Sequence, residues 1–309
     1  MEDNFVNIIG EQFVNESSSL SDKFRALFAL KNAGGNQAID WICKGFEHKS
    51  ALLKHECAYC LGQMQNEYAI PMLISVLSDK LQDPMVRHEA AEALGAIGSP
   101  DVINILTQYK DDSQVEVAET CEIALERIKW LQENERNEKD KISTNPYNSV
   151  DPAPPEVVTE ADVVSLRNTL LDESLALFKR YRALFSLRNI GGVSAVLAIA
   201  EGLKCKSALF RHEIAYVLGQ MQNEACVAHL KQCLEKSNES AMVRHECAEA
   251  LGAIAKGDCR KILETFVNDR EEVVKESCIV ALDMHDHEVS NDLEYTKTVD
   301  RMANCVPSC

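Results

Sequence analysis

The sequence predicts an all-α protein, an α-solenoid of helical hairpins in two duplicated halves of about four repeats each that face one another. Three observations lead to this prediction. Segments of the first half return at a constant spacing of 157 residues, so that KFRALFALKNAGG from Lys23 recurs as RYRALFSLRNIGG from Arg180. Within each half, a shorter period of about 31 to 33 residues repeats. Each such unit contains helix-periodic apolar residues, which it can bury only against its neighbours in the array.

The unit PMVRHEAAEALGAIG shows how the helices are recognised. Its apolar residues fall at i, i+4, i+7, i+8 and i+11 from Val86, which is the stripe of an amphipathic helix. The sequence Gly98-Ser99-Pro100 ends this helix, and Asp101 begins a second periodic run. The same reading places second helices near 37–46, 69–78 and 101–108, and at the duplicates of these ranges. Aromatic residues make up only 6% of the chain and β-branched runs are scarce, which also favours helix over sheet.

The domain organisation follows from the duplication. We expect an N-terminal half at 1–137, a linker at 138–158, a C-terminal half at 159–289 and a poorly ordered tail at 290–309. The linker contains NPYNSVDPAPP, whose four prolines and lack of period predict an extended segment. Its length would let the second half turn round and oppose the first.

The composition restricts the partners and the compartment. A net charge of −17 argues against nucleic acid, which is bound by clustered Lys and Arg, and suits a cationic ligand. No apolar stretch is long enough to cross a membrane and no signal peptide is recognised, so we expect a cytoplasmic protein that binds no membrane. Cys57 and Cys60 form a CxxC, but their duplicates are Ile214 and Val217. We therefore interpret these cysteines as reduced core residues rather than zinc ligands.

Four of the eight histidines occupy one position of the repeat and are each followed by glutamate. These pairs are His55-Glu56, His88-Glu89, His212-Glu213 and His245-Glu246. Each histidine comes two positions after a core residue, about 200° further round the helix, so the pairs are expected on the exposed inner face of the solenoid.

The outer repeats show that the fold does not require these pairs. They carry other residues at the same position: Phe24-Arg25 and Tyr181-Arg182 in the first unit of each half, and Glu119-Thr120 and Glu276-Ser277 in the fourth. Surface pairs copied by duplication without a role are the alternative. Solvated helix faces usually carry Lys, Glu and Gln, however, and four histidines there favour a function.

The chemistry that this residue set favours is metal binding. Two facing halves offer four imidazoles and four carboxylates, from which two His-His-carboxylate sets of the non-haem iron type can be made. Dinuclear carboxylate sites on helices fit this set, and so does a two-metal hydrolase. His285-Asp286-His287-Glu288 also resembles a metal motif, but it has no counterpart in the first half, where position 130 is Trp, and we expect no metal there.

The motifs together resemble a known family. VRxxAAxALGxIG resembles the HEAT repeat, which by itself says little about function. HEAT-type units in two halves, each with two [KR]-H-E motifs, joined by NPYNSVDPAPP, resemble the deoxyhypusine hydroxylase family from about residue 20 to 287. The N-terminal segment and the tail with Cys305 and Cys309 match poorly.

The resemblance implies a deoxyhypusine monooxygenase, a non-haem di-iron enzyme with two Fe²⁺ ions and O₂ as co-substrate. Its partner would be a deoxyhypusine-containing translation factor, whose modified side chain is hydroxylated to hypusine. By the family's pattern one iron is held by His55, His88 and Glu89 and the other by His212, His245 and Glu246. Glu56 and Glu213 would bind the substrate amines, or serve as additional ligands. A non-catalytic HEAT scaffold and a dinuclear metal hydrolase are the alternatives, and no sequence motif indicates the electron donor.

Overall fold

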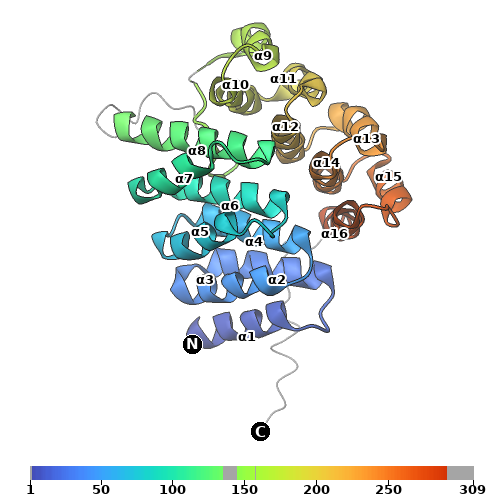
Figure 1. Cartoon of the computed structure of the whole chain (residues 1–309). Helices are drawn as coiled ribbons and strands as arrows, with labels where there is room; N and C mark the ends of the chain where they lie inside the picture. Colours follow the sequence, from blue (N-terminus) through green and yellow to red (C-terminus); the bar gives the residue numbers. More distant parts are fainter. Residues whose placement is uncertain (1, 135–144, 157, 291–309) are drawn as a thin grey trace.

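The protein is all-α, as the sequence predicts. The computed structural model describes residues 2–134, 145–156 and 158–290, and within these residues it has α-helices and short 3₁₀ helices but no β-strand (Figure 1). No helix in the described ranges is long and apolar enough to span a membrane. The first half contains α1 (Glu2–Val14), α2 (Leu20–Ala33), α3 (Gly35–Lys44), α4 (Ala51–Met64), α5 (Ile70–Ser78), α6 (Pro84–Ile97), α7 (Ile103–Tyr109) and α8 (Val115–Asn134). The second contains α9 (Val163–Leu171), α10 (Leu177–Ile190), α11 (Gly192–Glu201), α12 (Ala208–Met221), α13 (Val227–Glu235), α14 (Ala241–Ile254), α15 (Cys259–Phe266) and α16 (Glu272–Glu288).

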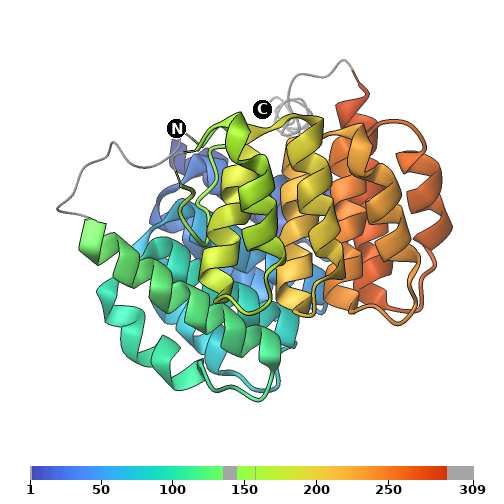
Figure 2. The same ribbon diagram turned by 90° about the horizontal axis from the view of Figure 1, so that it is seen from above.

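The even-numbered helices form a continuous inner row in each half. Helix α4 packs on α6 and α6 on α8, as α12 packs on α14 and α14 on α16 (Figures 1 and 2). The odd-numbered helices lie behind them; α3, α5 and α7 are the second helices expected from the repeat pattern. The tail at 290–309 lies outside the described residues except for Ser290, as do 138–144 and 157 of the predicted linker.

Two helices were missed in the sequence. Helix α1 buries Val6, Ile9 and Phe13 and is the outer partner of α2. Helix α9 is the corresponding partner of α10. Both begin their half, and a terminal repeat has only one neighbour to pack against, so its sequence departs from the repeat pattern.

Glycine allows neighbouring inner helices to approach closely. A Cβ added to Gly62 of α4 would lie 2.8 Å from the Cα of Ala93, and one added to Gly219 of α12 would lie 3.0 Å from the Cα of Ala250. Each of these glycines follows a histidine of the His-Glu pairs by seven residues, which is almost two full turns and therefore the same face of the helix. The close approach thus brings the His-Glu pairs of adjacent repeats together.

The two halves are joined by direct contacts that occur twice. Ser50 Oγ donates to Glu276 Oε2 at 2.6 Å, and Ser207 Oγ donates to Glu119 Oε2 at 2.7 Å. Ser50 and Ser207 are the N-caps of α4 and α12, and they also accept hydrogen bonds from their own helices. The last inner helix of each half therefore contacts the N-terminus of a histidine-bearing helix in the other half.

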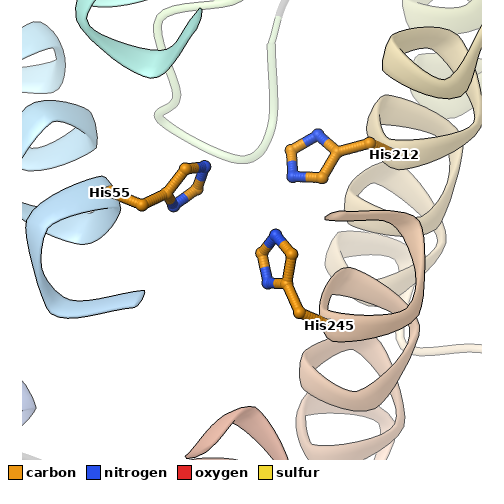
Figure 3. Close-up of side chains that lie close together, drawn as sticks. All are labelled: His55, His212 and His245. Atoms are coloured by element: carbon orange, nitrogen blue, oxygen red, sulfur yellow. The ribbon is translucent and has the colours of Figure 1, made fainter. Parts of the chain in front are cut away.

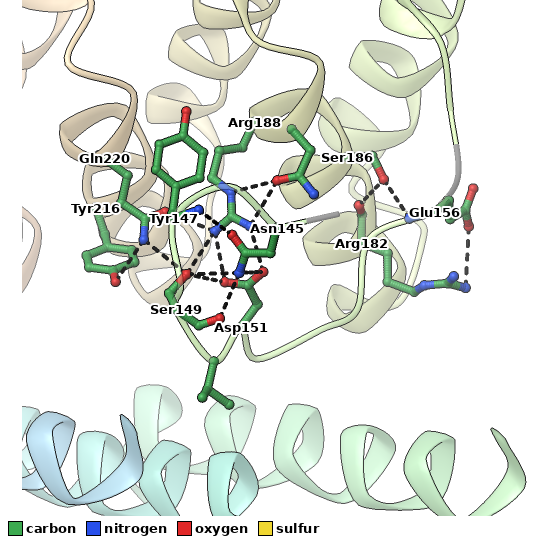
Figure 4. Close-up of polar contacts among 12 residues, drawn as sticks. Asn145, Tyr147, Ser149, Asp151, Glu156, Arg182, Ser186, Arg188, Tyr216 and Gln220 are labelled. Atoms are coloured by element: carbon green, nitrogen blue, oxygen red, sulfur yellow. Dashed lines mark hydrogen bonds and ion pairs between the residues drawn. The ribbon is translucent and has the colours of Figure 1, made fainter. Parts of the chain in front are cut away.

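The segment 145–156 is anchored between the halves (Figure 4). The Arg188 guanidinium donates to both carboxylate oxygens of Asp151, at 2.8 and 2.7 Å, and the Arg188 side chain is fully buried. Gln63 pairs with both backbone groups of Val150, accepting from its N–H at 2.8 Å and donating to its carbonyl at 3.2 Å. Arg127 Nε donates to the carbonyl of Asp151 at 2.9 Å. The described part of the linker is thus fixed to α4, α8 and α10 by polar contacts.

We expect Arg188→Ala to destabilise the protein by about 3–5 kcal/mol, because it leaves the buried Asp151 carboxylate without its partner. Lys31→Ala is the matched control, since Lys31 is the duplicate of Arg188 but is only half-buried and forms no bond with the described part of the linker. It should cost less than about 1 kcal/mol. Urea unfolding curves of the two variants measure the difference, and equal losses would show that the linker contact contributes little.

Candidate metal centre

The four histidines of the His-Glu pairs meet at the centre of the inner helices. The ring centroid of His55 lies 5.5 Å from that of His88, 5.7 Å from His212 and 5.3 Å from His245. His55 points toward His212 and His245 from the opposite half (Figure 3). His212 and His245 are themselves 5.2 Å apart. One repeat position, used four times, therefore supplies one cluster.

The cluster is buried, whereas the helical periodicity of the sequence predicts an exposed face for these pairs. The four side chains are from 0 to 6% exposed, and His88 and His245 are fully buried. The helical geometry behind the prediction is correct, because the pairs do leave the core stripe of each half. They are buried because the opposite half covers the inner face.

Within the described residues, no hydrogen bond is formed by Nδ1 or Nε2 of His55, His88, His212 or His245. Three of these eight nitrogens face a carboxylate oxygen at 3.2–3.5 Å, and the others face no such group in the part of the chain that the structure describes. A buried polar atom without a hydrogen bond costs about 1–3 kcal/mol, so this concentration of them needs an explanation. Neutral imidazole is a common metal ligand, and a bound cation would take up one nitrogen of each ring.

Glutamate oxygens lie beside the imidazoles. Glu89 Oε2 is 3.2 Å from His55 Nε2, and Glu246 Oε2 is 3.4 Å from His212 Nε2. Three sets of ligand atoms lie within 4.8 Å of one another in the described residues: His55, His88 and Glu89; His55, His212 and His245; and His245, Glu246 and Glu249. The donor set, nitrogen with carboxylate oxygen and no thiolate, fits iron better than a structural zinc site.

Two further glutamates, which the His-Glu pattern does not include, also line the central cavity, which has a volume of about 250 Å³. They are Glu92 and Glu249, each four residues after a histidine and therefore on the same helix face. Glu249 Oε1 is 3.5 Å from His245 Nδ1 and accepts a hydrogen bond from Ser277 Oγ at 3.1 Å. The sequence does contain an indication of this role. The residues four positions after the histidines of the four pairs are Tyr, Glu, Tyr and Glu, a pattern that follows the duplication.

The tyrosines at that position meet across the halves. The hydroxyls of Tyr59 and Tyr216 are 2.9 Å apart, and Gln220 Nε2 donates to the Tyr216 hydroxyl at 3.0 Å. Burial raises the pKa of both phenols well above the usual value, so both stay neutral at physiological pH. Glu56 and Glu213 line the same cavity.

Burial also sets the charge of the metal-free cluster. It lowers the pKa of His55, His88 and His245, so these rings are neutral. It raises the pKa of Glu89 to about 8, and that of Glu56 and Glu213 well above the ordinary value. These three imidazoles are thus neutral and these three carboxyl groups hold protons, which a bound cation would displace.

The CxxC cysteines take no part in the site. Cys57 and Cys60 are fully buried, and burial raises the pKa of both thiols well above the usual value. Their duplicates Ile214 and Val217 are equally buried. The interpretation of this pair as core residues agrees with these environments.

Comparison with known proteins gives consistent matches. HEAT repeats match residues 39–126 and 195–283. The deoxyhypusine hydroxylase of Rattus norvegicus is 56% identical over 297 residues, covering 96% of this chain and 97% of its own. That of Danio rerio is 55% identical over 300 residues, covering 97% and 98%. The solved structure of human deoxyhypusine hydroxylase in complex with glycerol superposes with a TM-score of 0.89 at 56% identity, covering 93% of this chain and 97% of that one.

The raised carboxyl pKa values predict a pH dependence of the metal-free protein. Glu89 and Glu92 have a pKa of about 8 in the folded state, above their ordinary value, so the folded chain holds protons that the unfolded chain has lost. Stability should therefore fall as pH rises from 7 to 8.5, by up to roughly 1.4 kcal/mol per pH unit for each proton held. The histidines with lowered pKa change the stability only below about pH 7, where histidine in the unfolded chain becomes protonated.

Ferrous iron should abolish this loss of stability, because its charge replaces the protons. Urea unfolding of the metal-free protein, with and without added iron under anaerobic conditions, measures the effect. Two pH profiles of equal slope would show that iron does not bind at these carboxylates.

We expect the double variant Cys57→Val, Cys60→Val to keep its metal and lose at most about 1–3 kcal/mol of stability through tighter packing. The duplicate half already holds branched aliphatic residues at both positions. Metal analysis and thermal unfolding test this, and loss of metal from a folded variant would identify the cysteines as ligands.

Proposed function

The chain belongs to the deoxyhypusine hydroxylase family, and on that premise we propose that its central cluster binds two iron ions and hydroxylates deoxyhypusine on a translation factor, using O₂. The observation that carries the proposal is the set of four buried imidazoles that are brought together from both halves and form no hydrogen bond with any described residue. Iron has the coordination chemistry that such a set of nitrogen and carboxylate donors favours.

We assign one iron to each half. His55, His88 and Glu89 hold the first, and their ligand atoms lie within 4.8 Å of one another. His212, His245 and Glu246 hold the second by internal duplication, supported by the 3.4 Å distance between His212 and Glu246. When bound, ferrous iron supplies open coordination positions and electrons with which O₂ is activated.

The protein itself excludes water and positions the substrate. Burial lowers the pKa of His55, His88 and His245, so these three imidazoles are in the neutral state that binds a metal. Glu56 and Glu213 face the cavity without being needed in the two ligand sets. Their carboxylates would form charge-assisted hydrogen bonds with the amines of deoxyhypusine and release their protons as the cation arrives. The net charge of −17 favours the approach of such a cation.

A scaffold that binds its partner directly through the His-Glu face is disfavoured. Each of the eight side chains is less than 10% exposed, so a protein surface cannot reach them while the halves are in contact. A side chain that enters the cavity can reach them, and this is what a hydroxylase needs.

We also propose that the protein works in a reducing compartment such as the cytoplasm. The ten cysteines within the described residues are all free thiols, and nine of them are buried. Ferrous iron requires the same reducing conditions.

The glutamates should divide into two classes. Glu89→Ala or Glu246→Ala should lose about one iron per chain, as should His55→Ala or His88→Ala, since each removes a ligand. Glu56→Ala and Glu213→Ala should keep both irons and lose affinity for the substrate protein. Iron content by mass spectrometry and binding by calorimetry separate the classes.

A wild-type protein that binds no iron, or that binds iron without converting deoxyhypusine to hypusine, would refute the proposed function. Equal iron loss in all four glutamate variants would refute only the division between ligands and substrate-binding residues. Hydroxylation is measured by amino-acid analysis of the substrate protein after incubation with O₂ and a chemical reductant.

A further inference from the structure

The internal duplication gives the central cavity two equivalent sides. On one side α2 of the first half meets α16 of the second, and on the other α10 of the second half meets α8 of the first. Residues 157 apart occupy corresponding places on the two sides. The corresponding pairs are Phe28 and Phe185, Lys31 and Arg188, Met284 and Arg127, and Glu288 and Leu131.

The linker covers the α8–α10 side. Residues 149–152, which we call the plug segment, lie against Arg127 and Arg188 through the hydrogen bonds of Asp151. Phe185 and Arg188 are fully buried there. Val150, Asp151 and Pro152 also form part of the wall of the central cavity. This side of the cavity is therefore closed by the chain itself.

Within the described ranges, no segment comparable to the linker lies over the α2–α16 side, where the two helices are joined by the ion pair of Arg25 with Asp283. Phe28 and Met284 are only half-buried and Glu288 is exposed, although Phe185 and Arg127 at the corresponding places are buried. A second cavity of about 250 Å³ lies here, lined by Phe24, Phe28, Glu56, Glu249, Met284, His287 and Glu288. Four of these residues, Phe28, Glu56, Glu249 and Met284, also line the central cavity. The two cavities thus form one path from the surface to the cluster.

The last inner helices of the two halves, α8 and α16, carry different residues at corresponding positions, and these residues suit a closed side at α8 and an open side at α16. The last turns of α8 carry Arg127, Trp130 and Leu131, which together with residues of the plug segment and its neighbours line a space of about 270 Å³. At the same places α16 carries Met284, His287 and Glu288. Arginine and apolar residues thus hold the linker on one side, and an acidic rim with an apolar wall remains on the other.

We propose that the plug segment closes one of the two sides, so that the substrate side chain enters only between α2 and α16. There Phe28 and Met284 contact its methylene groups, and the carboxyl groups of Glu56 and Glu249 bind its ammonium group. The proposal rests on the proposed function, since it takes an aliphatic ammonium side chain of a protein as the occupant. It makes the two entrances unequal, because Glu213 and Glu92 occupy the corresponding places beside the plug segment. Glu213 then meets only the part of the side chain that has already reached the central cavity. Phe28, Met284 and Glu249 then determine specificity on the substrate side alone.

The duplication provides the test, because each side can be given the residues of the other. Met284→Arg and Glu288→Leu copy the plugged side onto the substrate side, and Leu131→Glu is the matched control that copies the substrate side onto the plugged side. Met284→Arg places a cation in the path of a cationic side chain. It should raise KM for the deoxyhypusine-containing protein by about tenfold or more, equivalent to roughly 1.4 kcal/mol. Iron content and kcat should stay near the wild-type values.

Glu288→Leu should raise KM less, by about twofold to fivefold, because an exposed rim charge is screened. Its exposed position makes it informative even where Met284→Arg fails to fold. Leu131→Glu should leave KM unchanged. Wild-type KM in both substrate-side variants, or an increase in Leu131→Glu as large as theirs, would overturn the proposal. An inactive wild-type protein would instead refute the proposed function.

Discussion

The structure depends on keeping eight imidazole nitrogens away from water although they form no hydrogen bond with any described residue. This arrangement is unfavourable by itself, since a buried polar atom without a hydrogen bond costs about 1–3 kcal/mol. Ordinary packing offsets the cost: apolar stripes between repeats, glycines that allow α4 and α6 to touch, and contacts between the halves. The result is a preorganised set of ligand atoms, so metal binding does not have to supply the free energy of ordering them. A solenoid suits this purpose, because its core lies between its helix layers and the inner face remains available for chemistry.

Much of this could be read from the sequence. The 157-residue duplication and the 31–33-residue period predicted the fold, because both record which residues each helix must bury. The His-Glu pairs were recognised because the outer repeats carry other residues at the same position. Burial of the pairs could not be predicted in this way, since periodicity describes one helix face and not what lies opposite it. Helices α1 and α9 were missed because terminal repeats lose half of their packing constraints.

Glu92 and Glu249 show a different limit of prediction from sequence. Their signal was present in the sequence, one helical turn beyond each second histidine, but glutamate at a helix surface is common and attracts no notice. Only the structure shows that this turn faces the cluster. The contact of Asp151 with Arg188 could not be found by pattern at all, because it joins an irregular segment to a position that is lysine in the other half.

The contacts between the halves have one more consequence. Ser50 with Glu276, Ser207 with Glu119 and Tyr59 with Tyr216 are related so that each half offers the same surface to the other. This is the isologous interface of a twofold homodimer, here contained in a single polypeptide. A homodimer is obliged to have two identical approaches to its axis. A fused chain has one linker, which can lie on only one side of that axis, and so covalent fusion gives direction to a site that twofold symmetry would have left without any.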